Sequence, residues 1–494
     1  EGLLDELGEL LQTARSGKVV RLAEMDWPIG QYVSPAEQAA YHSRAALILH
    51  SRGAPLHEFG LVNPGASFEG PGVLHRRPYG SSEYIQILKP VHAPKPAYFA
   101  LRFAQDFLAG WKFARSVTVH DFDRRANRAF LYTNSAGQVA AAVWRAAGAA
   151  RTYTVPPAWK DVRAVDAFGF DVSLADGLRC AALPTFLTFP PSVGLAEAMH
   201  GLRTLQPADG ADPIALALYP AEEDSARRAR YAAEGGAERR EAYGQVPGGR
   251  KLRETFLEQL RSERFEFTLA EAGDALLTRL WRFEGDGQKL TVRLNDGPPA
   301  QWDLTRGKLS GADAGIRESS FVLRGCRAGT NAVQVAYEQP GNCAAWRVEP
   351  LAGGEIDLCR WGVLAAMQAK GQLQKFRSVV GTPLAIGKTR YATGLGTHAA
   401  SLIEVPLDGQ FSAFEATVGV DASTDGRGTV VFEILVDGVR KAHTEVLNGF
   451  SKPVTLKVEG LQTARRMALL VTDGGDRNAD DLANWVDAKL ILKE

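Results

Sequence analysis

The hydrophobic pattern of the first hundred residues changes between helical and extended periods. Leucines recur at helical spacing in the opening segment, and the apolar run 18–23 (KVVRLA) is typical of a buried strand. Residues 34–37 (SPAE) combine a capping box with proline at the first helical position, which predicts a helix to about residue 52. A strand over 56–62 and a helix from Pro96 follow. This alternation predicts parallel strands covered by helices.

Beyond residue 112 the pattern becomes one of short strands separated by Asn, Gly and Pro, which predicts a small antiparallel sandwich over 113–205. Residues 206–250 are rich in Ala, Glu, Arg and Gly. Because their charges are mixed in sign, we predict an exposed linker rather than a binding patch. Strands that alternate cleanly, such as 289–294 (KLTVRL), return over 251–354. This part resembles a jelly-roll of the galactose-binding type.

The last part of the chain, residues 355–494, carries five ordered motifs. They are Tyr391–Ala399, Gly419–Asp421, Val431–Gly438, Asp473–Asp476 and Asn484–Lys489. Their succession resembles NPCBM, a carbohydrate-binding module attached to many secreted bacterial glycoside hydrolases. The resemblance implies a β-sandwich that binds a poly- or oligosaccharide.

Sugar recognition needs aromatic rings for C–H stacking and a few planar hydrogen-bonding side chains. Among the motif residues, His398 and Trp485 have these properties, and we predict both as carbohydrate contacts. Each has an alternative. His398 follows a Gly-rich turn and has the position of a structural histidine, and Trp485 has the pattern of a core residue.

The loop Asp473–Asp481 is dense in side-chain oxygens, which suits a structural calcium ion. A solvated turn is the alternative, since no EF-hand spacing is present. We predict no other cofactor and no other metal, because the four cysteines match no zinc signature. We expect dispersed core thiols, with a Cys326–Cys343 disulfide as the alternative in an exported protein.

The run 18–28 is a predicted strand that ends in a carboxylate followed by Trp27-Pro28. Barrels of the (β/α)₈ type place their chemistry at the C-terminal ends of strands. Together with Gln38–Tyr41 and Pro94–Leu101, this run resembles the end of the barrel in clan A glycoside hydrolases. Members typically have Thr-Glu-x-Gly-Trp where this chain has Ala23–Trp27. The resemblance implies that residues 1–112 are the C-terminal part of such a barrel.

By that resemblance Glu24 is the nucleophile of a retaining glycosidase, and Trp27, Glu58 and Phe59 bind substrate. The alternatives are a salt-bridged rim carboxylate for Glu24, packing for Trp27 and ordinary rim positions for the other two. Retention needs a second carboxylic acid about 5–5.5 Å away. In the clan this acid lies upstream of all residues present, so we expect a missing N-terminal part and an inactive chain.

Lys plus Arg and Asp plus Glu both number 57, so the formal net charge is zero and no footprint for nucleic acid or an anionic membrane is visible. No apolar run reaches the ~18 residues that a membrane span needs. Protease and lipase signatures are missing from the sequence.

We therefore predict a mixed fold, with a partial (β/α)₈ barrel end followed by antiparallel sandwiches and jelly-rolls. The predicted function is that of an extracellular or periplasmic retaining glycoside hydrolase fragment. The alternative is a non-catalytic surface protein that binds carbohydrate.

Overall fold

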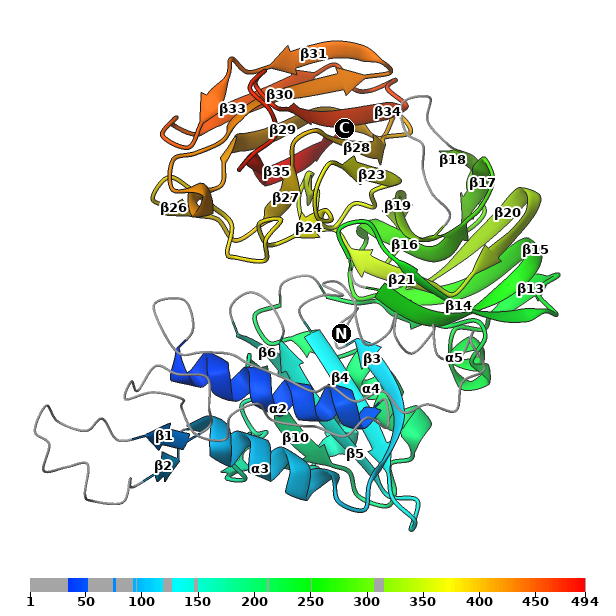
Figure 1. Cartoon of the computed structure of the whole chain (residues 1–494). Helices are drawn as coiled ribbons and strands as arrows, with labels where there is room; N and C mark the ends of the chain where they lie inside the picture. Colours follow the sequence, from blue (N-terminus) through cyan, green and yellow to red (C-terminus); the bar gives the residue numbers. More distant parts are fainter. Residues whose placement is uncertain are drawn as a thin grey trace, which may run out of the picture. The chain divides into compact units, whose positions relative to one another are not determined.

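The computed structural model describes residues 34–51, 74–76, 92–94, 96–118, 127–145, 150–210, 213–249, 251–305 and 315–493. The chain divides into two compact units, Glu1–Ala211 and Asp212–Glu494. Within the described ranges the fold consists mainly of antiparallel sheets with few helices (Figure 1). No described helix is long and apolar enough to cross a membrane.

Helices α2 (Pro35–Ser51) and α3 (Pro96–Leu108) begin where the sequence predicts them. In the capping box the Ser34 N–H donates to Glu37 Oε2 at 2.8 Å, and the Glu37 N–H donates to Ser34 Oγ at 3.2 Å. These two bonds satisfy donors that the first helical turn leaves open.

Both helices pack on an antiparallel sheet of the first unit (Figure 1). Leu47 and Ala100 of the helices share a hydrophobic cluster with Phe130, Trp144 and Phe186 of the sheet. The opposite face of the sheet packs on α4 (Leu195–Arg203) and on a small sheet of order β11-β6-β9. The strands of the larger sheet are, in spatial order, β3 (Lys112–Thr118), β4 (Asn127–Thr133), β5 (Val139–Arg145), β10 (Thr185–Thr188), β7 (Arg163–Val165) and β8 (Asp171–Val172). Those of the small sheet are β11 (Gln206–Pro207), β6 (Arg151–Thr154) and β9 (Leu178–Cys180).

The partial barrel predicted for residues 1–112 has no counterpart among the described residues. The strands that it requires, 18–23 and 56–62, lie outside the described ranges. The described strands of this region, β1 (Leu74–Arg76) and β2 (His92–Pro94), pair antiparallel. The predicted helices are present, but the sheet that they cover is that of the predicted sandwich.

The second unit begins with a β-sandwich, here called the first sandwich, whose core includes Trp281, Trp302 and Trp346. One sheet has the order β12 (Leu216–Leu218), β21 (Ala345–Pro350), β16 (Gly273–Phe283), β19 (Gly315–Cys326). The other has the order β13 (Ala232–Glu234), β15 (Lys251–Leu269), β20 (Gly329–Cys343), β17 (Gly287–Leu294), β18 (Ala300–Thr305), with β14 (Arg239–Gln245) also on β15.

The linker predicted at residues 206–250 instead supplies strands: β11 belongs to the small sheet of the first unit, and β12, β13 and β14 belong to the first sandwich. Strand β12 pairs with β21, and both β13 and β14 pair with β15, while α5 (Glu223–Arg228) lies between β12 and β13. The mixed charges that suggested a linker lie partly on α5 and partly on the strands β13 and β14, whose exposed charged side chains discourage pairing between molecules.

Residues 355–492 form the second sandwich, in agreement with the predicted β-sandwich. One sheet has the order β24 (Gln374–Lys375), β27 (Gly394–His398), β35 (Leu482–Leu492), β29 (Phe411–Val420), β33 (Val454–Glu459), with β22 (Glu355–Asp357) also on β35. The other has the order β23 (Ala365–Gln368), β28 (Ser401–Pro406), β34 (Arg466–Thr472), β30 (Thr429–Val436), β31 (Val439–His443), with β32 (Leu447–Asn448) also on β30. A hairpin turn joins β30 to β31, with positive φ at Asp437 and Gly438, a dipeptide typical of such turns.

The two sandwiches share one strand order. In the first sandwich β15-β20-β17-β18 pair in one sheet and β16-β19 in the other. In the second sandwich β27-β35-β29-β33 pair in one sheet and β28-β34 in the other. Numbered by their succession along the chain, these strands of both sandwiches therefore pair in the same pattern. Corresponding positions can therefore be compared. The N–H of Asn295, after β17, donates to the Ala332 carbonyl oxygen, and in the second sandwich the N–H of Asp421, after β29, donates to the Leu482 carbonyl oxygen.

The sandwiches are joined by shared core residues and by polar bonds. Leu276 and Val322 of the first sandwich belong to the hydrophobic cluster of the second. Gln410 Oε1 accepts the Val322 N–H at 2.7 Å. Arg466 donates to Glu404 at 2.7 Å and lies 3.5 Å from Asp303 of the first sandwich. The second sandwich thus buries part of its surface against its neighbour.

The four cysteines lie at described positions, and all are buried and unpaired. Burial raises the pKa of Cys180 to about 12 and that of Cys326 to about 11. These protonated, inaccessible thiols agree with the core interpretation, and Cys326 and Cys343 do not form the alternative disulfide.

The contact region between the two sandwiches, here called the joint, contains a carboxyl group whose ionisation opposes folding. Asp408 Oδ1 accepts the Asp303 N–H at 3.4 Å, and Oδ2 has no partner among the described residues. Burial raises the pKa of Asp408 to about 7; the hydrogen bond from the Asp303 N–H opposes this rise, and the charge of the Asp303 carboxylate adds to it. Because the folded-state pKa is raised, this group's contribution to stability is present at low pH and is lost as the pH rises through about 7.

We predict that Asp408→Asn stabilises the second unit more at pH 8 than at pH 5. The amide keeps the shape and an acceptor but cannot ionise, so the gain in unfolding free energy should grow by ~1–3 kcal/mol over this interval. Urea unfolding at both pH values measures it. Asp425 is an exposed aspartate that also has positive φ, so Asp425→Asn is the control. Equal effects of Asp408→Asn at both pH values would contradict the prediction.

Candidate functional site

Two of the six predicted site residues lie in the described part of the chain. Glu24, Trp27, Glu58 and Phe59 lie outside the described residues. His398 and Trp485 lie on adjacent strands of the second sandwich, on β27 and β35.

Trp485 lies in the core of the second sandwich. Its side chain is 0% exposed, and its ring meets that of Phe432 edge-on, with centroids 5.0 Å apart. In register it stands opposite Leu395 on β27 and Val418 on β29. In this position the indole has no free face for a sugar, so the geometry favours the core role over the stacking role.

His398 ends β27, at the corner where the chain passes into β28. The ring is 5% exposed, and Nδ1 lies 2.6 Å from the Ala399 carbonyl oxygen. Since a carbonyl only accepts, Nδ1 is the donor in this contact. This arrangement fits both a structural histidine and a ligand contact.

Asp481 precedes β35 beside this corner, and its backbone oxygen accepts the Ala399 N–H at 3.0 Å. The carboxylate is 0% exposed: Oδ1 accepts the Thr429 N–H at 2.9 Å, and Oδ2 has no partner within the described ranges. Burial raises the pKa of Asp481, the Asp476 and Asp473 charges add to the rise, and Thr429 and His398 oppose it. An unpartnered buried acceptor is costly, so this oxygen is a candidate ligand contact.

A second polar pair fixes a hairpin on the outer face of the same sheet. Asn484 Nδ2 donates to Asp421 Oδ2 and, at 3.2 Å, to the Ala385 carbonyl oxygen. The hairpin of β25 (Ala385–Ile386) and β26 (Thr389–Arg390) thereby covers the sheet, and Ile386 packs on Val486. We assign Asp421 and Asn484, both motif residues, to positioning this hairpin.

The acidic loop before β35 makes its own hydrogen bonds. Asp473 Oδ1 accepts the Gly475 N–H at 3.2 Å, and Asp476 Oδ1 accepts the Thr429 hydroxyl at 2.6 Å. Among the described residues no group of three or more side chains of metal-ligand type gathers. The turn interpretation accounts for these contacts without calcium.

The corresponding end of the first sandwich is closed by its own side chains. By strand register, Asn331 stands where the second sandwich has Asp481. Its Oδ1 accepts from Asn295 and from the Arg327 N–H, each at 3.0 Å, and its Nδ2 donates to the carbonyls of Arg327 and Gly329. A fully bonded amide leaves no polar atom for a ligand.

One exposed residue at this end of the sandwich had not been predicted. Phe450, after β32, is 84% exposed and lies against Gly426 of the loop between β29 and β30. The available signal was Asn448-Gly449, a turn dipeptide that presents an isolated aromatic residue in a polar segment. We call the end of the second sandwich that carries His398, Thr429, Phe450 and Asp481 the loop end.

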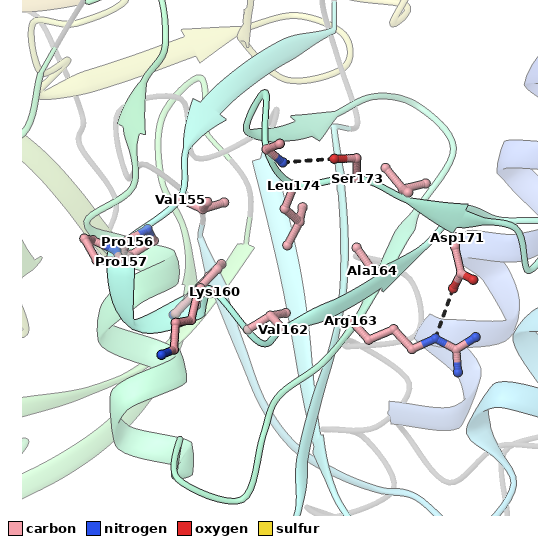
Figure 2. A pocket seen from close by; sticks show the side chains of 13 residues that line it. Val155, Pro156, Pro157, Lys160, Val162, Arg163, Ala164, Asp171, Ser173 and Leu174 are labelled. Atoms are coloured by element: carbon pink, nitrogen blue, oxygen red, sulfur yellow. Dashed lines mark hydrogen bonds and ion pairs between the residues drawn. The ribbon is translucent and has the colours of Figure 1, made fainter.

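The first unit has a groove of about 750 Å³ beside β7 and β8 (Figure 2). Lys160, Arg163 and Asp171 supply its charges, and Arg163 pairs with Asp171 at 3.0 Å. Trp159 also lines it but is 2% exposed, so its ring is not free for stacking. None of the predicted site residues is among those that line this groove.

The NPCBM/NEW2 domain family matches residues 356–491. The second sandwich is an NPCBM domain. The match spans both sheets and the loop end, so the chain carries a carbohydrate-binding module at its C-terminus, as the motifs predicted.

Two curated relatives are glycosidases by name. A candidate endo-alpha-N-acetylgalactosaminidase of Renibacterium salmoninarum is 34% identical over 131 residues, covering 26% of this chain and 8% of that protein. The alpha-1,3-galactosidase B of Akkermansia muciniphila is 27% identical over 170 residues, covering 34% of this chain and 20% of that protein. The chain thus spans a fifth or less of the length of these relatives.

Among solved structures, the CBM51 domain of a Clostridium perfringens GH95 protein, in complex with methyl-galactose, is 28% identical to this chain. It covers 28% of this chain and 99% of its own, with a TM-score of 0.27. The CBM51-2 and INT domains of Clostridium perfringens ZmpB, in complex with GlcNAc, are 26% identical and cover 31% of this chain and 34% of their own, also with a TM-score of 0.27.

We predict that Trp485→Ala destabilises the NPCBM domain by ~3–5 kcal/mol, because removal of a fully buried indole leaves a cavity beside Phe432. Trp485→Phe should cost less. His398→Ala, which removes a smaller ring at the edge of the fold, should change stability by less than about 2 kcal/mol. Denaturant unfolding of the whole chain measures all three, and wild-type stability in Trp485→Ala would rule out the core role.

Proposed function

We propose that the NPCBM domain binds a neutral sugar at the loop end, with Asp481 and His398 as its polar contacts. The observation that carries the proposal is the unpartnered Oδ2 of a carboxylate that is 0% exposed. A sugar hydroxyl is a matching donor, and a hydrogen bond to a charged acceptor contributes about 1.5–3 kcal/mol. The names of the two relatives make galactose-type sugars the first ligands to test.

Recognition at this site should be weak. A shallow sugar site buries little apolar area while it orders several hydroxyl groups. Millimolar to high-micromolar Kd values correspond to only ~4–6 kcal/mol.

We further propose that the chain is part of a longer extracellular glycoside hydrolase that acts on poly- or oligosaccharides. Support comes from the NPCBM domain and from relatives that are themselves named as glycosidases. Within that proposal Glu24 is the nucleophile, and Trp27, Glu58 and Phe59 contact the substrate. Trp485 is left out of the sugar site because its ring is enclosed.

For sugar binding, calorimetry of the whole chain with methyl β-galactoside is the direct experiment. Asp481→Asn should weaken binding ~10-fold or more, because the amide replaces a charged acceptor. Asp286→Asn, an exposed aspartate in a turn of the first sandwich, is the control and should bind like the wild type. Wild-type affinity in Asp481→Asn would remove this residue from the site. A glycan array on which the folded chain binds no sugar would overturn the proposal.

For catalysis, we predict that the 494-residue chain does not hydrolyse aryl galactosides, because by the clan resemblance the partner acid of Glu24 belongs to an earlier strand of the barrel. In the longer gene product, Glu24→Gln should abolish turnover while methyl β-galactoside still binds at the NPCBM domain. Robust hydrolysis by the present chain, or full activity of the longer Glu24→Gln variant, would contradict the assignment.

A further inference from the structure

We propose that Phe450 is the aromatic platform of the loop end, on which the C–H face of the sugar ring packs. The inference rests on the proposed sugar binding and adds the residue that supplies its apolar contact.

The Phe450 ring is exposed but held in place. Its side chain is 84% exposed, and an apolar group of this size in water gains from being covered by a ligand. A Cβ added at Gly426 would overlap the tip of this ring, so the ring lies directly on the glycine backbone. The Phe450 N–H donates to Asn448 Oδ1 at 2.9 Å, and the Asn448 N–H donates to Ser451 Oγ at 2.9 Å. These contacts fix the turn that carries the ring.

The ring lies close to the unpartnered carboxylate. The segment Gly426–Thr429 links the two. Gly426 lies against the Phe450 ring, and the Thr429 N–H donates to Asp481 Oδ1. Thr429 also pairs with Asn448 on β32. Three steps of the chain span at most ~11 Å, so the glycine under the Phe450 ring and the residue that bonds Asp481 lie within the length of a disaccharide.

Together these two residues have the chemistry of a sugar site. A pyranose ring has a face of C–H groups and an edge of hydroxyl groups. An aromatic ring packs on the first, and a carboxylate accepts from the second. Loss of the stacking contact should weaken binding by a moderate factor, because the sugar covers only one side of the Phe450 ring.

The experiment is calorimetry of the whole chain with methyl β-galactoside. Phe450→Ala should weaken binding ~5–30-fold, Phe450→Leu should weaken it nearly as much, and Phe450→Trp should keep it, because the contact needs a flat ring. Val439→Ala, which removes exposed apolar surface on β31, is the control and should bind normally. Unfolding curves check that the variants at Phe450 and Val439 keep the wild-type stability.

A second pair of variants tests the position of the ring without removing it. Gly426 and Gly438 have similar positive φ angles, 88° and 83°, but only at Gly426 would a Cβ meet Phe450. Gly426→Ala should therefore weaken binding, whereas Gly438→Ala carries the same backbone strain and should not. If the wild type binds and Phe450→Ala binds equally well, the platform role is wrong and the sugar-binding proposal stands. If the wild type binds no sugar, the proposed function itself fails.

Discussion

The loop end depends on one strand. Strand β35 lies between β27 and β29 and hydrogen-bonds to both. This pairing places Trp485 in the core, Asn484 on the outer face and Asp481 at the corner beside His398. Because side chains alternate along a strand, a shift by one residue would exchange the core and outer positions. The register of β35 therefore fixes the core and the candidate site together.

The two sandwiches show that a shared fold does not bring a shared site. Their strands pair in the same order, and both carry a buried polar residue at the same corner. Asn331 both donates and accepts, so its neighbours bond it completely. Asp481 only accepts, and one of its oxygens is left without a donor among the described residues. The chemical difference between an amide and a carboxylate separates a closed end from one that can bind a ligand.

The start of the first sandwich shows how mixed charge can mislead. The sequence of residues 206–250 looks like a solvated linker, yet its strands are edges of the first sandwich. Edge strands need charged residues for solubility, and a linker needs them as well, so composition does not distinguish the two. Only the pairing partners, which lie far along the chain on β15 and β21, decide the outcome.

The sequence by itself determined the local features and the C-terminal module. The capping box of α2, the Asp437-Gly438 hairpin and the NPCBM motifs all depend on residues close together in the chain. Burial was decided only by the tertiary structure: Trp485 is enclosed and Phe450 is exposed, although either aromatic residue fits a strand or a sugar site. The unpartnered oxygen of Asp481 is also a tertiary feature, because whether a donor reaches it depends on Thr429 and His398, which come from other strands. Contacts of this kind join residues far apart in the chain, and hydrophobic spacing carries no information about them.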